Sequence, residues 1–276
     1  MTREGPDRHR SGSLADVEPV ERVVCDGFPL EAAFLVFEDS FGRICRVYAE
    51  RCMPRRTSAP PLVHCPGGGQ TVDRADLLDW AGKGFACAAF DWQIGRFPDH
   101  DPARKSRWPD GVVGQNQYIE SETEAVLPLA VQAAGACLDW LHASDCVRSE
   151  ASGVVGISWG GYLAWLVAAY ESRIAAAVPL YGCGGQFQPG HPAAFRLPPA
   201  MERLWRERWD PYTVAPRRGK PTCYLSASND FFGIAPLADE LLNRLSAPHR
   251  REWLPNANHC ISPGGGALGL AWLRHY

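Results

Sequence analysis

The pentapeptide Gly-Ile-Ser-Trp-Gly at residues 156–160 is the feature that most limits how this chain can fold. An apolar, β-prone run over 151–157 leads into it, and a helix-forming run over 162–170 leads out. A serine at such a sharp strand-to-helix turn adopts strained backbone angles, and only glycine fits where neighbouring backbones approach so closely. The pattern therefore predicts that Ser158 is a nucleophile raised above the sheet, beside helix N–H groups that can stabilise an oxyanion.

The rest of the chain alternates between short apolar runs and helix-forming segments. Continuous apolar runs are typical of strands that are buried on both faces of a parallel sheet. We expect such strands over residues 61–65, 84–90, 151–157, 174–180, 221–228 and 249–254. We expect helices over residues 72–82 and 118–143, the second interrupted by Pro128. This alternation predicts an α/β fold with a mostly parallel, doubly wound sheet.

Three segments fall outside this alternation. Residues 33–50 have the pattern of two strands around a turn at 39–42, so we expect an N-terminal antiparallel hairpin. Residues 1–20 are rich in charge, Gly, Pro and Ser, and we expect a flexible tail there. Residues 182–220 are rich in Gly, Pro, Trp and Arg and are expected to form a small cap or lid insertion. Residues 21–276 then make up a single domain.

Composition excludes several other classes of protein. A chain of 276 residues, 46% of them hydrophobic, can bury one large core. A formal net charge of -3 gives no electrostatic reason to expect a nucleic acid or an anionic membrane as partner. We find no signal-peptide core and no bilayer-spanning run, and we expect a cytoplasmic protein. The ten cysteines lack the spacing of a zinc site and are interpreted as reduced, buried apolar residues.

A serine nucleophile needs a base and an orienting acid, which follow it in this type of fold in the order Ser, Asp or Glu, His. Asp230 comes directly after the expected strand at 221–228, at the carboxyl edge of the sheet, where catalytic groups gather. His259 lies in a turn-forming loop after the last expected strand. We therefore interpret Ser158, Asp230 and His259 as a catalytic triad.

Other acidic and histidine residues offer alternatives to these roles. Asp230 would otherwise be a turn or cap residue. Asp210 and Glu252 are its rivals as the acid, but the first lies in the expected cap segment and the second inside a strand. His64 either helps to shape the glycine-rich loop that follows it or is a hydrogen-bonded core histidine, and we favour the core position.

The oxyanion hole is expected from the loop His-Cys-Pro-Gly-Gly-Gly-Gln at residues 64–70, because consecutive glycines expose their N–H groups. We expect the backbone N–H of Trp159 to act together with that of Gly68 or Gly69, with Gln70 as the alternative. Each such donor is typically worth about 3 kcal/mol in the transition state. A phosphate loop is disfavoured, because no Gly-Lys-Ser/Thr follows the glycines.

Five short motifs of this chain are Pro-Gly-Gly-Gly-Gln-Thr at 66–71, Phe-Asp-Trp at 90–92, Gly-Ile-Ser-Trp-Gly-Gly-Tyr at 156–162, Pro-Leu-Tyr-Gly-Cys-Gly at 179–184 and Ser-Asn-Asp-Phe at 228–231. Together they resemble the acetyl xylan esterase and dienelactone-hydrolase-like branch of the α/β-hydrolases, over roughly residues 62–259. The resemblance implies the α/β-hydrolase fold, the triad given above and a small ester substrate. Two departures are Pro66, where such enzymes often have His, and Ser158, where dienelactone hydrolases proper have Cys.

From the motifs and the resemblance we expect a serine hydrolase that cleaves small carboxylic esters through an acyl-enzyme, with an acetyl ester, on a carbohydrate for example, as the favoured substrate. Its partner is then a small-molecule ester, and no metal or organic cofactor is required. Trp92, Tyr181 and Trp209 are expected to line the substrate pocket, with core packing as their alternative. A prolyl-oligopeptidase-like serine peptidase and a non-catalytic binding protein of the same fold are the alternative functions. The sequence does not indicate the oligomeric state.

Overall fold

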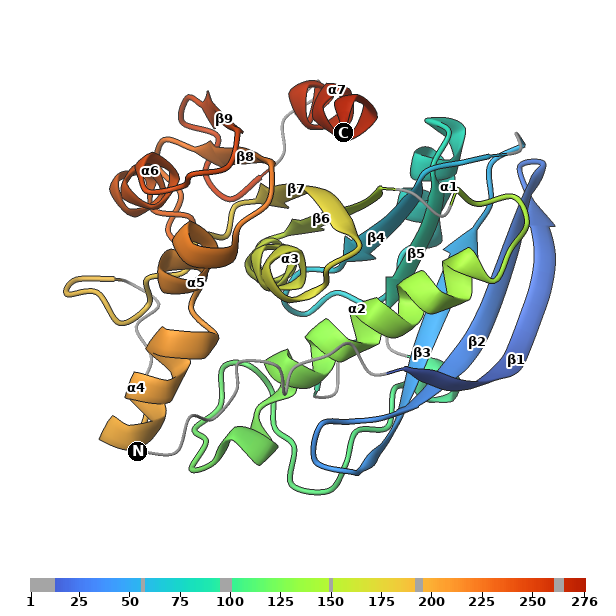
Figure 1. The fold of residues 1–276 in the computed structure, drawn as a ribbon, viewed down its shortest axis with the longest axis horizontal. Coiled ribbons are helices and arrows are strands. Elements are labelled where there is room, and N and C mark those ends of the chain that lie inside the picture. Colours follow the sequence, from blue (N-terminus) through green and yellow to red (C-terminus); the bar gives the residue numbers. More distant parts are fainter. Residues whose placement is uncertain (1–12, 56–57, 95–100, 149–150, 192–195, 261–265) are drawn as a thin grey trace.

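The computed structural model describes residues 13–55, 58–94, 101–148, 151–191, 196–260 and 266–276. Within these residues, nine strands form one mixed sheet in the order β1-β2-β3-β5-β4-β6-β7-β8-β9. Figure 1 shows this sheet with α2 and α3 on the side nearer the viewer. The chain therefore has the α/β-hydrolase architecture that the sequence predicts, a mostly parallel sheet with helices on both faces.

The strands are β1 (Leu14–Cys25), β2 (Phe28–Glu38), β3 (Ile44–Cys52), β4 (Pro61–Cys65), β5 (Ala86–Phe90), β6 (Ser152–Ile157), β7 (Ile174–Leu180), β8 (Thr222–Ala227) and β9 (His249–Leu254). The helices are α1 (Arg74–Gly82), α2 (Val126–His142), α3 (Trp159–Tyr170), α4 (Pro199–Arg208), α5 (Pro211–Arg218), α6 (Ala235–Asn243) and α7 (Ala267–His275), with short 3₁₀ turns η1 (Pro102–Arg104) and η2 (Glu122–Glu124). Among the described helices, none is long and apolar enough to cross a membrane.

The N-terminal part of the sheet is antiparallel. Strands β2 and β3 form the predicted hairpin, and β3 joins the rest of the sheet by pairing antiparallel with β5. The prediction of a flexible tail over residues 1–20 was wrong for residues 14–20, because they belong to β1, which pairs with β2 along its length. Backbone pairing stabilises this edge strand despite its charged composition. Residues 1–12 lie outside the described residues.

The six strands β4 to β9 are parallel to one another. Each matches its predicted range to within two residues at each end. Their side chains alternate between two hydrophobic clusters. Leu62, Cys87 and Val155 face α1 and α7, whereas Val63, Ala88 and Val154 face α2 and α3. Because both faces of the sheet are covered, the strands are apolar without interruption, as the sequence pattern indicates.

The helix expected over residues 118–143 is shorter than predicted. It begins at Val126, and residues 122–124 form the separate 3₁₀ turn η2. Pro128 consequently lies in the first turn of α2, where the backbone N–H has no partner within the helix to lose. The predicted interruption at this proline was therefore wrong.

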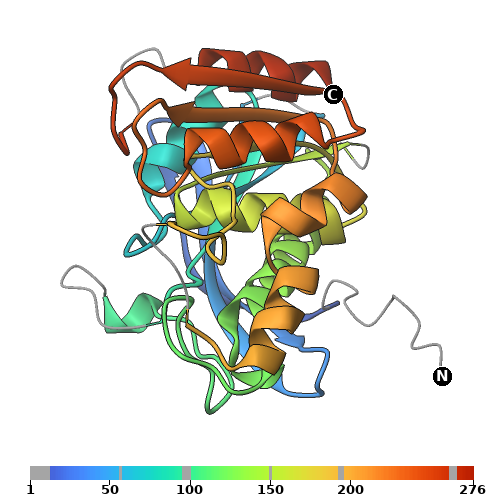
Figure 2. The same ribbon diagram turned by 90° about the vertical axis from the view of Figure 1, so that its left-hand side faces the viewer.

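The segment between β7 and β8 contains α4 and α5; in Figure 1 and Figure 2, α5 lies beside α3 and α4 extends away from it. Tyr162 of α3 bonds to the C-terminal end of α4: its hydroxyl donates to the carbonyl of Trp209 (2.7 Å) and accepts from Nε1 of Trp205 (3.0 Å). Tyr170, also on α3, donates to the carbonyl of Arg208 (2.6 Å). These bonds anchor the described part of this segment on α3, and its role as a cap stays a prediction.

Candidate active site

Ser158 lies between the end of β6 and the start of α3 with φ 58° and ψ -121°. This conformation is costly for a residue with a side chain, and such strain persists only where the surroundings enforce it. Here the N–H of Ser158 donates to the carbonyl of Leu180 (2.8 Å), and its carbonyl accepts from the N–H of Tyr162 (2.9 Å). The strand on one side and the helix on the other thus hold the serine in its strained turn.

Glycine is required at positions 156 and 160 because other backbone atoms lie too close for a side chain, not because the chain needs flexibility there. A Cβ atom at Gly156 would overlap the carbonyl of Gly160, and a Cβ atom at Gly160 would overlap the carbonyl of Cys65 at the end of β4. The helix N-terminus therefore packs directly on the backbone of the neighbouring strand. This close approach is the geometry that the sequence predicts for the pentapeptide.

Asp230 and His259 meet at the carboxyl edge of the sheet, after β8 and β9. Oδ2 of Asp230 lies 2.7 Å from Nδ1 of His259. The other carboxylate oxygen, Oδ1, accepts from the backbone N–H groups of Phe232 (2.6 Å) and Gly233 (2.5 Å). Three contacts therefore fix the orientation of a side chain that is fully shielded from solvent.

The pairing with Asp230 determines the tautomer of the His259 ring. Because Nδ1 faces a carboxylate, it carries the proton, and Nε2 of the neutral ring is the acceptor. Nε2 is buried and has no hydrogen-bond partner in the described part of the chain. The rings of Tyr181, Phe231 and Phe232 surround the imidazole at centroid distances of 5.4, 4.8 and 6.1 Å. The imidazole is thus fixed by Asp230 and the three rings, with Nε2 unpaired among the described residues.

A cavity of about 420 Å³ opens beside Ser158. Five segments form its walls: the glycine loop, the segment after β5, a polar loop before η2, the serine turn and the segment after β8. In that order they contribute Gly68 and Gly69, Gln93 and Ile94, residues 114–117, Ser158 and Trp159, and Phe231 and Phe232. A second cavity of about 330 Å³ shares Gln115, Asn116 and Gln117 with the first and is also lined by Tyr118, Arg196, Leu197 and Trp205. The two cavities therefore share a wall in this polar loop, and the second reaches Trp205 of α4.

The N–H groups of the glycine loop differ in their availability. That of Gln70 donates to the carbonyl of Gly67 (3.1 Å), which closes a turn. That of Gly69 faces Oε1 of Gln93 at 3.4 Å. Among the described residues, the N–H of Gly68 has no hydrogen-bond partner, and this glycine packs against the Trp159 ring in the cavity wall. Of the three loop donors predicted from sequence, Gly68 is therefore the one whose N–H is unpaired in the described part of the chain.

Residues 115–262, more than half of the chain, match the sequence model of the Dienelactone hydrolase family. The chain belongs to the dienelactone hydrolase family. This membership agrees with the family resemblance that its motifs indicate. A comparison with curated proteins found no match.

Solved structures of esterases share the fold of this dienelactone hydrolase family member. The acetyl xylan esterase from Paenibacillus sp. R4 superposes with a TM-score of 0.73 at 17% identity, covering 98% of this chain and 91% of that one. Acetyl xylan esterase 1 from Thermoanaerobacterium sp. JW/SL YS485 gives 0.69 at 18% identity, with 94% and 87% covered. A cold-adapted esterase from an Arctic intertidal metagenomic library gives 0.63 at 17% identity, with 92% and 97% covered.

Three aromatic residues predicted to line the pocket are buried instead. Trp92, Tyr181 and Trp209 are at most 1% exposed, and none belongs to the described lining of either cavity near Ser158. Each side chain donates a hydrogen bond to a residue outside the α-helices and strands. Nε1 of Trp92 donates to the carbonyl of Pro66 (2.9 Å), and the hydroxyl of Tyr181 donates to the carbonyl of Cys260 (2.6 Å). Nε1 of Trp209 donates to the carboxylate of Glu122 (3.0 Å). The structure therefore corrects their position from pocket lining to loop support.

The rivals to the triad residues have other surroundings. Asp210 caps α5, with Oδ1 accepting from the N–H groups of Gly185 (2.8 Å) and Tyr212 (3.0 Å), and burial raises its pKa to about 6. Glu252 lies within β9, as expected. His64 is buried, as expected, and burial lowers its pKa. The expected hydrogen bond is not found at Nδ1, which lies 3.9 Å from Asp76 and has no hydrogen-bond partner in the described part of the chain.

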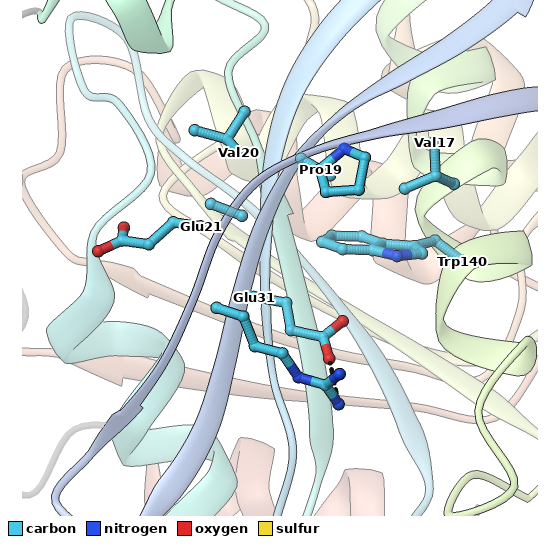
Figure 3. Close-up of a pocket in the computed structure, with 9 residues that line it drawn as sticks. Val17, Pro19, Val20, Glu21, Glu31 and Trp140 are labelled. Atoms are coloured by element: carbon cyan, nitrogen blue, oxygen red, sulfur yellow. Dashed lines mark ion pairs between the residues drawn. The ribbon is translucent and has the colours of Figure 1, made fainter.

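A separate hollow of about 280 Å³ lies at the other end of the sheet, between β1, β2 and α2. Figure 3 shows the ring of Trp140 beside Val17 and Pro19, with Glu31 at the margin of the hollow. Three charged residues line the hollow, Glu21, Arg22 and Glu31, and Arg22 and Glu31 pair at 3.0 Å. The described lining of this hollow contains no serine, cysteine or histidine, whereas the first cavity is lined by Ser158.

The contact at Gly160 generates a prediction about stability. Gly160→Ala should lower the free energy of unfolding by about 1–3 kcal/mol or more, because the new methyl group displaces the backbone of β4. Urea unfolding measures the loss. Gly82→Ala is the matched control: an added Cβ there meets no atom within 4 Å, so stability should stay unchanged or rise. Equal losses in the two variants would contradict the assignment of Gly160 as a contact glycine.

Asp210 generates a prediction about pH. Its folded-state pKa of about 6 exceeds the ordinary 3.8, so the folded protein binds the extra proton and loses this stabilisation as the pH rises through that interval. Asp210→Asn keeps the Oδ1 acceptor and removes the buried charge. At pH 7.5 the variant should be more stable than wild type by up to about 3 kcal/mol, and at pH 4 the two should be similar. A pH-independent difference in urea unfolding would refute the burial argument.

Proposed function

We propose that this protein is a serine esterase that hydrolyses small carboxylic esters, acetyl esters above all, through an acyl-enzyme. The observation that carries the proposal is the 2.7 Å pair of Asp230 and His259 at the sheet edge that also presents Ser158. Ser158 lines a cavity large enough for a small ester. A base, its orienting acid and a strained serine in this order are the parts that nucleophilic catalysis of acyl transfer needs.

In the first half of the reaction, Oγ of Ser158 attacks the ester carbonyl while Nε2 of His259 takes its proton. Asp230 holds the ring in the tautomer with Nδ1 protonated and stabilises the positive charge that develops on it. The carbonyl oxygen becomes an oxyanion. The N–H groups of Gly68 and Trp159, which line the same cavity, are the donors that we assign to it.

The tetrahedral adduct then collapses. The alcohol leaves with the proton held on Nε2 of His259, and the acyl group stays on Oγ of Ser158. In the second half, His259 takes a proton from water, the resulting nucleophile attacks the acyl carbon, and the proton returns to Oγ. The sum is one ester and one water converted into one acid and one alcohol.

The shape of the cavities favours a short acyl group and a polar alcohol. The cavity beside the serine has a volume of about 420 Å³ and has to hold both the acyl group and the alcohol of the ester. The adjoining cavity shares Gln115, Asn116 and Gln117 with it and reaches Trp205. Amide groups and an aromatic residue suit a hydroxylated ligand, so an acetylated carbohydrate is the substrate class that we propose. Two of the solved structures that share this fold are acetyl xylan esterases.

Ser158→Ala should abolish hydrolysis of p-nitrophenyl acetate, because no other nucleophile replaces Oγ. The wild type should cleave the acetate fastest, the butyrate more slowly and the octanoate slowest. Ser246→Ala, an exposed serine, is the control and should keep wild-type rates. Equal activity in Ser158→Ala and wild type would exclude the proposed nucleophile. A wild type that cleaves aryl amides faster than esters would favour the peptidase alternative.

Asp230→Asn should lower kcat by roughly 10³- to 10⁴-fold with little change in stability, since the amide favours the wrong tautomer of His259. The two backbone N–H bonds to Oδ1 can persist in the variant. Asp210→Asn is the matched control among buried aspartates and should retain kcat. Stopped assays of p-nitrophenyl acetate measure both. If kcat fell in Asp210→Asn and not in Asp230→Asn, Asp210 rather than Asp230 would be the acid that orients the histidine.

A further inference from the structure

Gln93 is a residue of the cavity wall that the triad and the oxyanion loop do not account for. It follows β5 at the carboxyl edge of the sheet, and its side chain is only 2% exposed, yet it lines the cavity that contains Ser158. Its Nε2 is buried and has no hydrogen-bond partner in the described part of the chain. A buried amide that lacks a partner is costly, and one in a cavity wall is placed to bind what enters.

The contacts of Oε1 determine which way this amide faces. Oε1 of Gln93 lies 3.0 Å from Nε2 of Gln115 and 3.4 Å from the N–H of Gly69, both of which are donors. Turning the amide over would set its NH₂ group against two other donors. Oε1 is therefore the atom that faces Gly69 and Gln115, and Nε2 is left as a donor.

This donor lies next to the oxyanion loop. Gly69 contacts Gln93 directly, and Gly68, the neighbouring residue, has the loop N–H that is unpaired among the described residues. Gln93, Gly68 and Ser158 line the same cavity, so the amide that carries Nε2 belongs to the wall that surrounds a carbonyl oxygen bound at Gly68. The position is preorganised, since Gln115 and Gly69 both fix the side chain before substrate enters.

We propose that Gln93 is a further catalytic residue of the esterase, donating from Nε2 to the carbonyl oxygen of the substrate as that oxygen becomes an oxyanion. The inference rests on the proposed function. It adds a side-chain donor to the two backbone donors, Gly68 and Trp159. The side chain of Gln93 also links the loop after β5 to the glycine loop after β4, so one amide both supports and extends the oxyanion site.

The experiment compares kcat and KM for p-nitrophenyl acetate with the Ki of trifluoroacetophenone. This ketone accepts Oγ of Ser158 at its carbonyl carbon, the C=O π bond breaks, the Oγ proton moves to His259, and an oxyanion remains. Gln93→Met removes the donor at similar length. Gln93→Glu removes the donor but keeps acceptor oxygens for Gly69 and Gln115. Gln132→Met is the control, because Gln132 is an equally buried glutamine on α2, away from the cavity lining.

Both Gln93 variants should lose roughly 10²-fold in kcat at nearly constant KM, and the Ki of the ketone should rise in parallel. Gln132→Met should change none of these values by more than about threefold. Three results would overturn the inference: wild-type kcat in Gln93→Met, wild-type kcat in Gln93→Glu, or a loss confined to KM. If Gln93→Met does not fold, Gln93→Glu decides the question.

The same measurements separate this inference from the proposed function. An active wild type, an inactive Ser158→Ala and unaffected Gln93 variants would overturn only the role of Gln93. A wild type that neither cleaves the ester nor binds the ketone would overturn the esterase proposal and the role of Gln93 with it.

Discussion

The contact between the N-terminus of α3 and the carboxyl end of β4 is the constraint on which the rest of the structure depends. Gly160 lies so close to the carbonyl of Cys65 that no side chain fits between them. This contact brings the serine turn and the glycine loop together. It also sets how closely α3 packs on the sheet, and the segment with α4 and α5 is in turn hydrogen-bonded to α3.

The order of the strands then determines which groups can meet. The segments that follow β5, β4, β6, β8 and β9 all begin at the same edge of the parallel part of the sheet, because parallel strands end together. Gln93, the glycine loop, Ser158, Asp230 and His259 come from these five segments. Residues far apart in the sequence thereby share one site, and no single loop has to hold it.

Much of this arrangement could be predicted from the sequence. Buried parallel strands produce uninterrupted apolar runs, so the bounds of β4 to β9 agree closely with the predicted ranges. Asp230 and His259 were identifiable because each follows such a run, and they do meet in the structure. What these strands have in common is that burial on both faces leaves a strong compositional signal.

The remainder depends on contacts that leave no local pattern. Strand β1 is stabilised by pairing with β2 rather than by its own hydrophobicity, and its charged, proline-containing sequence resembles a tail. Trp92, Tyr181 and Trp209 are buried because distant loops supply their hydrogen-bond acceptors. Gln93 was missed for the same reason, although its place directly after the Phe-Asp-Trp motif at 90–92 was a usable signal.

The separation of the antiparallel strands from the site has a consequence for how this fold tolerates change. In the sheet order, β1 and β2 stand at the end opposite β8 and β9, with β3 as the only link to the parallel strands, and none of the described residues in the cavity beside Ser158 comes from these three strands. Substitutions at exposed positions of this N-terminal edge therefore leave the described cavity lining intact, whereas substitutions at its buried positions act on the core shared with α2.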